Sequence, residues 1–178
     1  MKKALFFLTI LSLVVFSCEK YPVDNTATVD LAGQWYVIYN CIDAQGNVIE
    51  GFEDFNGGYS MALTFNTSSN TKDSIWVSDS KDMNLLGYQV KVPCNLENLT
   101  FGSENESLNV YGPSDVVGEK AIVKNGKILK GAAKTPSGMP ADSIYFEVKL
   151  LDDYYAARYG YDAYQVTGYR YTGFAADE

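Results

Sequence analysis

Apolar and polar side chains alternate with a period of two residues along much of the chain after residue 30. Such alternation is typical of half-buried antiparallel strands, which turn one face to a core and the other to solvent. In residues 58–65, GYSMALTF, one face carries Tyr59, Met61, Leu63 and Phe65. In residues 143–150, SIYFEVKL, one face carries Ile144, Phe146, Val148 and Leu150. We predict a strand at each segment, with these apolar faces turned inward.

Shorter segments continue the same pattern. Further strands are expected at 73–79, 85–93, 107–111 and 164–172, with a weaker one at 98–102. The segment AIVKNGKIL predicts a hairpin with Asn125-Gly126 at its tip, because both residues accept the positive φ of a type I′ turn. In that hairpin Val123 would lie opposite Ile128.

No segment has a helical period over several turns, and residues 152–160, DDYYAARYG, would hold at most one helical turn. Eight to ten short strands with almost no helix predict an all-β domain. We expect an antiparallel up-and-down β-barrel of about eight strands, and a β-sandwich is the alternative.

The first 30 residues lack the alternation. Residues 1–17 begin with MKK and continue with an apolar run that is short for a membrane span, as in a signal peptide. A small residue directly before Cys18 resembles the cleavage site of a bacterial lipoprotein. We therefore predict that Cys18 is lipidated and holds the protein on the outer membrane, with plain secretion as the alternative. Residues 18–30 would then be a polar tether and residues 31–178 the barrel domain.

Two further cysteines, Cys41 and Cys94, remain in the mature chain. Strand parity turns Cys41 to the same side as Trp35, Val37 and Tyr39, and Cys94 to the same side as Tyr88, Val90 and Val92. A disulfide between them would suit a chain outside the cytoplasm. Two buried free thiols are the alternative.

Charge argues against some partners. The chain has 22 acidic and 14 basic residues, and loss of Lys2 and Lys3 with the signal would take the net charge from −8 to −10. Such a surface repels phosphate backbones and anionic head groups, so we expect no nucleic-acid partner. The membrane contact would be made by the lipid rather than by a basic patch.

A glycine and a tryptophan open the first strand, LAGQWYVIYN, in the pattern Gly33-x-Trp35. This pattern resembles the signature of lipocalins and the wider calycin group. The resemblance implies that Trp35 closes one end of a barrel and that Arg170, in the last strand, lies across its ring as a cation–π partner. The lipoprotein signal, DLAGQWYV and the closing VTGYRYTGF also resemble the small Bacteroidetes lipoproteins grouped as lipid-binding putative hydrolases. That resemblance implies a lipocalin-like barrel, an envelope location and a lipid-like ligand.

Candidate catalytic groups are few. The chain has no histidine, which excludes Ser-His-Asp and Cys-His catalysis and histidine-ligated zinc. It has no Gly-x-Ser-x-Gly motif. The acidic doublets Glu53-Asp54 and Asp152-Asp153 are read as solvated turn acids, because neighbours on a strand point to opposite faces. We name no catalytic residue, metal or cofactor, although a hydrolase of lipid esters or glycosides stays open as an alternative.

The inward faces of the predicted strands suggest where a ligand would bind. An eight-stranded barrel can enclose one small molecule, such as an acyl chain, a sterol or an aromatic compound. The predicted ligand-binding residues are Val37, Tyr39, Met61, Leu63, Phe65, Tyr88, Val90, Phe146 and Val148. The alternative is that these side chains fill the barrel. A third function is a surface interaction through a tyrosine-rich face formed by Tyr154, Tyr155, Tyr159, Tyr161, Tyr164, Tyr169 and Tyr171.

Overall fold

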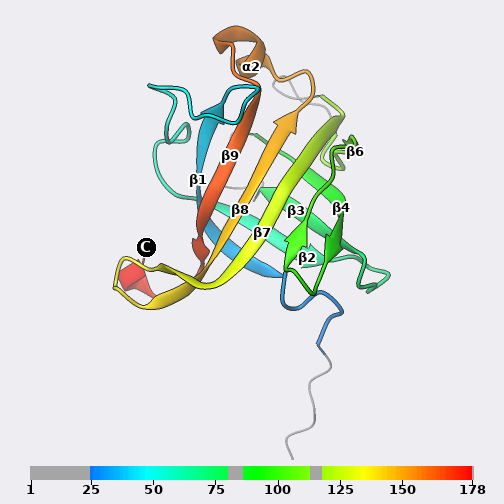
Figure 1. Cartoon of the computed structure of the whole chain (residues 1–178), viewed down its shortest axis with the longest axis vertical. Helices are drawn as coiled ribbons and strands as arrows, with labels where there is room; N and C mark the ends of the chain where they lie inside the picture. The colour runs from blue at the N-terminus through cyan, green and yellow to red at the C-terminus, as the bar shows by residue number, and fades with distance from the viewer. Residues whose placement is uncertain (1–24, 80–85, 113–117, 178) are drawn as a thin grey trace, which may run out of the picture.

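The computed structural model describes residues 25–79, 86–112 and 118–177. Nine strands make one sheet: β1 (Gly33–Ile42), β2 (Ser60–Asn66), β3 (Ser74–Asp79), β4 (Gln89–Asn95), β5 (Thr100–Phe101), β6 (Ser107–Leu108), β7 (Lys120–Lys134), β8 (Pro140–Leu150) and β9 (Ala163–Arg170). The helix α2 (Tyr154–Tyr159) joins β8 to β9, and a 3-10 turn, η1 (Ala175–Asp177), follows β9. The sheet is curled into a barrel with α2 at one end (Figure 1).

Pairing of the strands closes this barrel. Neighbours along the sheet follow the order β5-β4-β3-β2-β1-β9-β8-β7-β6, and β5 pairs a second time with β7. That second pairing completes a ring of eight antiparallel strands, with β6 attached beside β5. The predicted up-and-down barrel is therefore confirmed, and the sandwich is not formed, because a sandwich would leave the sheet open.

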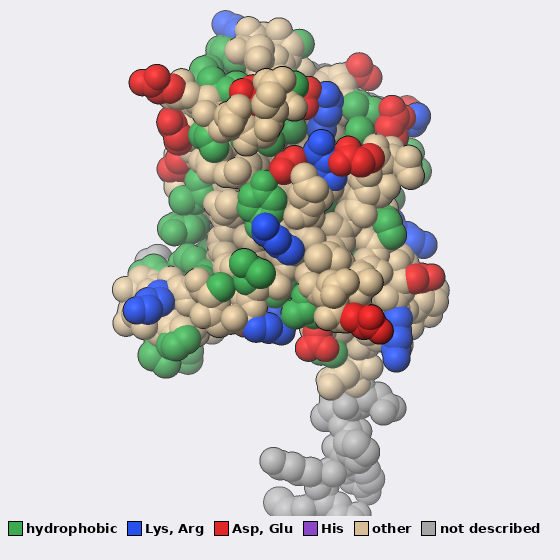
Figure 2. Space-filling view, viewed as in Figure 1, with side chains coloured by type: hydrophobic (Ala, Val, Ile, Leu, Met, Phe, Trp, Pro, Cys, Tyr) green, Lys and Arg blue, Asp and Glu red, His purple; other side chains and the backbone are tan. Residues whose placement is uncertain are grey.

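The two ends of the barrel differ. At one end β1 begins and β9 finishes, with Trp35 directly opposite Arg170, and we call this the closed end. At the other end Ile42 lies opposite Ala163, and the β1–β2 connection and α2 stand above the strands. We call this second end the mouth. Acidic side chains are frequent around it on the face shown in Figure 2.

Most predicted strands occur at or near the expected residues, and the segment 152–160 holds the single helical turn of α2. The inward face of β8 is confirmed, since Ile144, Phe146, Val148 and Leu150 are buried. Residues 26–32 form turns, and Thr28 is fully buried, so part of the predicted tether contacts the barrel. Cys18 and the signal segment lie outside the described residues. Among the described residues, no helix is long and apolar enough to cross a membrane.

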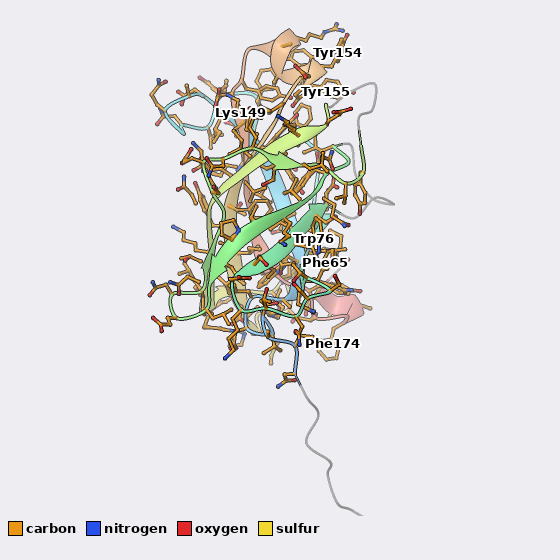
Figure 3. The ribbon with its side chains drawn as sticks, turned by 90° about the vertical axis from the view of Figure 1, so that its right-hand side faces the viewer. Phe65, Trp76, Lys149, Tyr154, Tyr155 and Phe174 are labelled. Atoms are coloured by element: carbon orange, nitrogen blue, oxygen red, sulfur yellow. The ribbon has the colours of Figure 1, made fainter. Side chains whose placement is uncertain are left out.

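The predicted inward face of β2 is wrong. Ser60, Ala62 and Thr64 are the buried residues, whereas Met61, Leu63 and Phe65 are half-buried on the outer wall. The reason lies in the neighbouring strand, because Trp35 is paired with Ala62 and a large inward ring needs small neighbours. Phe65 instead stacks on Trp76 at 6.4 Å between ring centroids on the outside (Figure 3).

The predicted hairpin at Asn125-Gly126 is also wrong. β7 continues through both residues, and the register slips between the pairs Lys124–Glu147 and Lys127–Tyr145, which marks a β-bulge. Asn125 does take positive φ, at 55°, but as a bulge residue rather than a turn residue. Val123 pairs with Val148 and Ile128 with Ile144, so the two residues are not opposite each other.

Cys41 and Cys94 are free thiols in the structure, against the predicted disulfide. Strand alternation correctly predicts that both side chains face the interior, but it does not give their positions along the barrel axis. Cys41 lies at the mouth, where Asp153 acts on its charge, and Cys94 lies at the closed end beside Asp73. Burial, followed by the Asp153 charge, raises the pKa of Cys41 to about 12, so this thiol is protonated and unreactive at neutral pH.

Candidate functional site

Trp35 and Arg170 form the contact expected at the closed end. The guanidinium carbon of Arg170 lies 4.3 Å from the centroid of the Trp35 ring, within the range of a cation–π interaction. The indole is fully buried, and its Nε1–H donates to Thr64 Oγ1 at 2.9 Å. Gly33 permits this arrangement, because a Cβ there would stand 2.3 Å from Arg170 Nη1.

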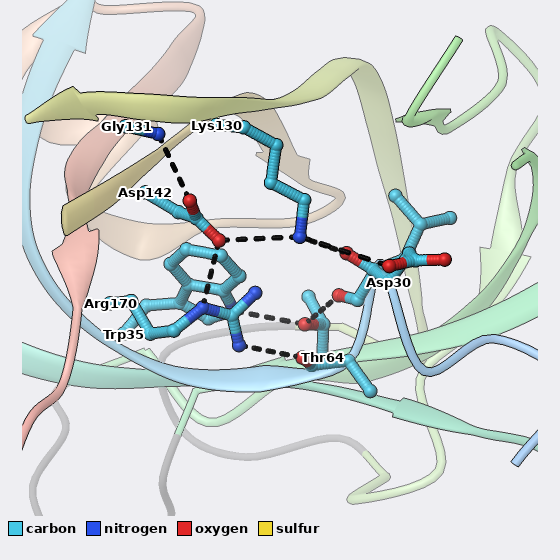
Figure 4. A network of polar contacts seen from close by, with 9 residues as sticks. Asp30, Trp35, Thr64, Lys130, Gly131, Asp142 and Arg170 are labelled. Carbon is cyan, nitrogen blue, oxygen red and sulfur yellow. Dashed lines mark hydrogen bonds and ion pairs between the residues drawn. The ribbon is translucent and has the colours of Figure 1, made fainter. Parts of the chain in front are cut away.

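Polar partners fix the guanidinium over the ring (Figure 4). Arg170 Nη1 donates to the carbonyl oxygen of Ala32 at 2.8 Å, and Nε donates to Asp142 Oδ2 at 3.2 Å. Burial alone would raise the pKa of Asp142, but hydrogen bonds from Gly131 and Lys130 and the nearby positive charges hold it below its ordinary value. This network holds Arg170 and Asp142 in place at the floor of the barrel.

Six of the predicted ligand-binding residues face the interior: Val37, Tyr39, Tyr88, Val90, Phe146 and Val148. All six have an exposed fraction of 0%. A cavity large enough for a ligand would leave accessible surface on the side chains around it, so the interior beside these residues is filled. Their role in holding a ligand stays a prediction, and it would require the core to open.

The filled interior contains three polar side chains, those of Asp79, Tyr39 and Tyr88. Asp79, at the end of β3, is fully buried and accepts hydrogen bonds from the backbone N–H groups of Gly87 and Tyr88 at 2.7 and 2.8 Å. Desolvation outweighs these bonds and raises the pKa of Asp79 to about 6. The hydroxyls of Tyr39 and Tyr88 lie 3.0 Å apart, and burial raises the pKa of both phenols.

The mouth carries a pocket of about 440 Å³ between the β1–β2 connection and α2. Its walls are Gly51, Phe52, Glu53, Asp54 and Phe55 from the connection, and Tyr155 and Tyr159 from α2. The volume lies within the range of small-molecule sites. Four of its seven lining residues are aromatic, and we take it as the candidate site.

Hydrogen bonds to β1 hold the connection in place. The backbone N–H of Phe55 donates to the carbonyl of Tyr39 at 2.7 Å, and the N–H of Cys41 donates to the carbonyl of Phe52 at 3.0 Å. The Asn40 side chain accepts from the N–H of Asp54 at 2.9 Å. Phe52 and Phe55 are therefore presented by backbone that is bonded to a barrel strand.

Asp153 holds the other wall. Its carboxylate caps α2 by accepting from the N–H groups of Tyr155 and Ala156 at 2.8 and 3.2 Å. The same carboxylate accepts a hydrogen bond from the Tyr164 hydroxyl at 2.8 Å, and that hydroxyl also bonds the Tyr161 hydroxyl. Burial raises the pKa of both tyrosines, so they stay neutral beneath the pocket.

Three of the four acids in the acidic doublets hold backbone N–H groups. Glu53 accepts from the N–H of Gly51 at 2.9 Å, and Asp54 accepts from the N–H of Gly58 at 2.7 Å. Asp153 is occupied by the helix cap. No group of three His, Cys, Asp or Glu side chains suited to a metal ion occurs among residues 25–79, 86–112 and 118–177.

The seven tyrosines of the predicted tyrosine-rich face are divided among three places. Tyr154, Tyr155 and Tyr159 lie on α2, and Tyr161 and Tyr164 lie beneath the pocket. Tyr169 and Tyr171 lie on the outer wall, where both contact the ring of Tyr36. They do not form one continuous surface.

A comparison with protein families agrees with this architecture. The family described as lipid-binding putative hydrolase matches residues 20–175, which is most of the chain. The chain belongs to this family. Among curated proteins, none matches it. Membership in the lipid-binding putative hydrolase family and the barrel are both consistent with binding of a lipid, while the Bacteroidetes origin and the relation to lipocalins stay predictions.

Sequence reasoning missed the phenylalanine half of this site. GFEDF was considered for its two acids, although its two phenylalanines, Phe52 and Phe55, are what line the pocket. The sequence predicts Tyr155 and Tyr159 only as members of a tyrosine-rich face. Their spacing of four residues, which puts two side chains on one helix face, was the signal available in the sequence.

Proposed function

We propose that this protein binds a hydrophobic or lipid-like small molecule at the mouth of its barrel. The observation that carries the proposal is the aromatic pocket of about 440 Å³ between residues 51–55 and α2. Phenylalanine and tyrosine rings offer large apolar area at low conformational cost, which suits an acyl chain or an aromatic compound. Membership in the lipid-binding putative hydrolase family supports the same ligand class.

The mouth is preferred to the interior because it already offers space. Binding in the interior would have to displace side chains such as Tyr39 and Phe146, which are fully buried in a packed core. Binding between residues 51–55 and α2 needs no such change. The pocket floor, formed by the tyrosines below, would keep the ligand out of the core.

The location of the protein is part of the proposal. We propose that Cys18 carries lipid and that the protein sits on the outer membrane as a lipoprotein. The support is the sequence alone, namely the apolar run that ends directly before Cys18. No contact with nucleic acid is proposed, in keeping with the acidic net charge.

Hydrolysis is not proposed. Glu53, Asp54 and Asp153 are engaged by backbone N–H groups, and the thiol of Cys41 is held protonated by burial.

A fluorescent probe tests the binding proposal. N-phenyl-1-naphthylamine is uncharged and gains fluorescence in apolar sites, so it should bind the purified protein at the mouth. Phe52→Ala should weaken probe binding by about ten- to a hundredfold, because burial of a phenyl ring on a ligand is worth roughly 1.5 to 3 kcal/mol. Tyr159→Ser, at a position that is 48% exposed, tests the same pocket with less risk to folding.

Phe174→Ala is the matched control. Phe174 is 68% exposed and lies at the opposite end of the molecule from α2 (Figure 3). Its loss should leave probe binding unchanged. Equal weakening by Phe174→Ala and Phe52→Ala, or full binding by both Phe52→Ala and Tyr159→Ser, would overturn the proposal.

A further inference from the structure

We propose that the mouth pocket recognises a cationic end group, such as a trimethylammonium, and rejects carboxylates and phosphates. This inference rests on the proposed function, since it names the class of ligand that the same pocket would take. It follows from two separate features of the pocket, a closed ring of aromatic side chains and an excess of negative charge.

Five aromatic side chains form the ring. Phe52 contacts Tyr159 at 5.6 Å between ring centroids, Tyr159 contacts Tyr155 at 6.4 Å, and Tyr155 contacts Phe55 at 5.8 Å. Tyr161 completes the circuit, 6.0 Å from Phe55 and 6.4 Å from Phe52. Four of the five are walls of the pocket, and Tyr161, which is 6% exposed, lies beneath them.

Such a ring is suited to a cation. The face of an aromatic ring carries partial negative charge, and several faces around one space attract an ammonium group without hydrogen bonds. Arg158 shows that this cluster accepts a cation, because its guanidinium carbon lies 5.5 Å from the centroid of the Tyr159 ring. A quaternary ammonium is also weakly hydrated, so it loses little on leaving water.

The charges around the pocket have the matching sign. Residues 43–59 contain Asp43, Glu50, Glu53 and Asp54 and no Lys or Arg. Residues 151–162 contain three aspartates and one basic residue, Arg158. Glu53 and Asp54 are themselves part of the wall. An anionic head group placed here would face like charges at close range, which costs free energy.

Backbone geometry keeps these carboxylates at the rim. The N–H groups of Gly51 and Gly58 hold Glu53 and Asp54 in their turns, so neither acid needs a ligand to be ordered. Lys149, in the mouth half of β8, is paired with Asp162 at 2.5 Å rather than with either of these acids. The pocket therefore presents rings inside and negative charge outside.

Three ligands of equal chain length test the inference. Decyltrimethylammonium, 1-decanol and decanoate would compete with bound N-phenyl-1-naphthylamine at low ionic strength. We expect decyltrimethylammonium to compete about tenfold better than decanoate, with 1-decanol between them. The preference should shrink in high salt, because exposed charges are screened.

Variants separate the two features. Tyr155→Leu keeps apolar volume but removes a ring, so it should reduce the affinity for decyltrimethylammonium several-fold and leave that for 1-decanol nearly unchanged. Glu53→Gln removes one charge from the pocket wall, and the glutamine side chain can still accept a hydrogen bond from the N–H of Gly51. It should therefore reduce the affinity for decyltrimethylammonium and leave the affinity for 1-decanol unchanged. Glu50→Gln, in the same segment but outside the pocket wall, is the matched control and should have little effect.

The outcomes distinguish this inference from the proposed function. If neither the probe nor any of the three ligands binds, the proposed function fails. If all three compete equally, or decanoate competes best, the protein binds amphiphiles but the inferred head-group class is wrong. If Glu50→Gln reduces the affinity for decyltrimethylammonium as much as Glu53→Gln does, the preference comes from the overall charge of the protein and not from the pocket. The inference is then overturned.

Discussion

At the scale of single residues, Trp35 and Arg170 are expected to stabilise the closed end by different amounts. Trp35→Ala should lower the free energy of unfolding by about 3 to 5 kcal/mol, because it leaves a large void and removes the hydrogen bond to the Thr64 hydroxyl. Arg170→Lys should lower it by about 0.5 to 2 kcal/mol, since lysine keeps the charge but loses the planar stack. Urea unfolding of each variant measures both values.

The double variant shows whether the two side chains act together. Its loss should be smaller than the sum of the single losses, because the contact is already absent once Trp35 is removed. Arg158→Lys, an exposed arginine on α2, is the matched control and should change stability by less than about 0.5 kcal/mol. Strictly additive losses would mean that the cation–π contact contributes nothing.

Asp79 should give the protein a distinct dependence on pH. Its folded pKa of about 6 lies above the ordinary aspartate pKa of 3.8, so the folded state binds this proton more tightly than the unfolded state does. The stabilisation from this proton is complete below about pH 4 and is lost as the pH rises through about 6. The loss should amount to about 1 to 3 kcal/mol.

Asp79→Asn isolates that contribution. Other carboxyl groups, such as Asp142 and Asp177, have lowered pKa values, and their opposite slope is the same in both proteins and cancels. The difference in unfolding free energy between wild type and Asp79→Asn, measured in urea from pH 4 to pH 7, should therefore fall as the pH rises. Parallel curves would show that Asp79 does not titrate in this range.

At the scale of elements, the bulge in β7 is expected to be needed for closure of the barrel. Gly126 pairs with Phe101 of β5, the strand that joins β4 to β7. A Cβ at Gly126 would stand 2.4 Å from Phe101 Cδ2 and 2.5 Å from the Phe101 carbonyl oxygen. Gly126→Ala should therefore cost about 1 to 3 kcal/mol by overpacking, and amide exchange in β5 should accelerate.

Gly138→Ala is the comparison for that prediction. Gly138 has positive φ, at 86°, but nothing lies within 4 Å of a Cβ there. Its substitution costs backbone strain alone, about 1 to 2 kcal/mol, and should leave β5 exchange unchanged. If the two variants gave the same exchange pattern, the contact with Phe101 would not be what closes the barrel.

The position and inward face of a strand could be predicted from the sequence only where the local pattern of residues determines them. The alternation in β8 puts four apolar residues on one face and mainly polar ones on the other, so the predicted inward face is confirmed. In β2 the more apolar face, with Met61, Leu63 and Phe65, is the outer one, because the ring of Trp35 on the neighbouring strand needs the small residues on the inside. Asn125-Gly126 specified positive φ, but a contact 25 residues away, with Phe101, decided between a turn and a bulge. The candidate site depends on such distant contacts throughout.

At the scale of the whole molecule, the two ends of the barrel differ in structure. The chain enters at the closed end, where Arg170 lies over Trp35, and the acidic aromatic pocket lies at the opposite end. The segment from Cys18 to residue 25 spans at most about 25 Å, at 3.3 to 3.6 Å per residue. A lipid on Cys18 would thus keep the closed end near the membrane and leave the mouth facing away from it, where anionic head groups cannot reach the pocket.

Anchoring through Cys18 is open to a direct test. Protein extracted from its own membranes should have the intact mass of a chain that begins at Cys18 and carries acyl groups, since each buried CH₂ contributes about 0.8 kcal/mol to membrane binding. Residues 19–178 behind an unrelated secretory signal should be recovered in the soluble fraction, and they should bind the neutral probe as the anchored protein does. Cys94→Ala, which removes a different cysteine, should stay with the membranes. An intact mass without acyl groups, or membrane retention of residues 19–178, would show that Cys18 is not the anchor, and the orientation of the mouth argued from it would then have no basis.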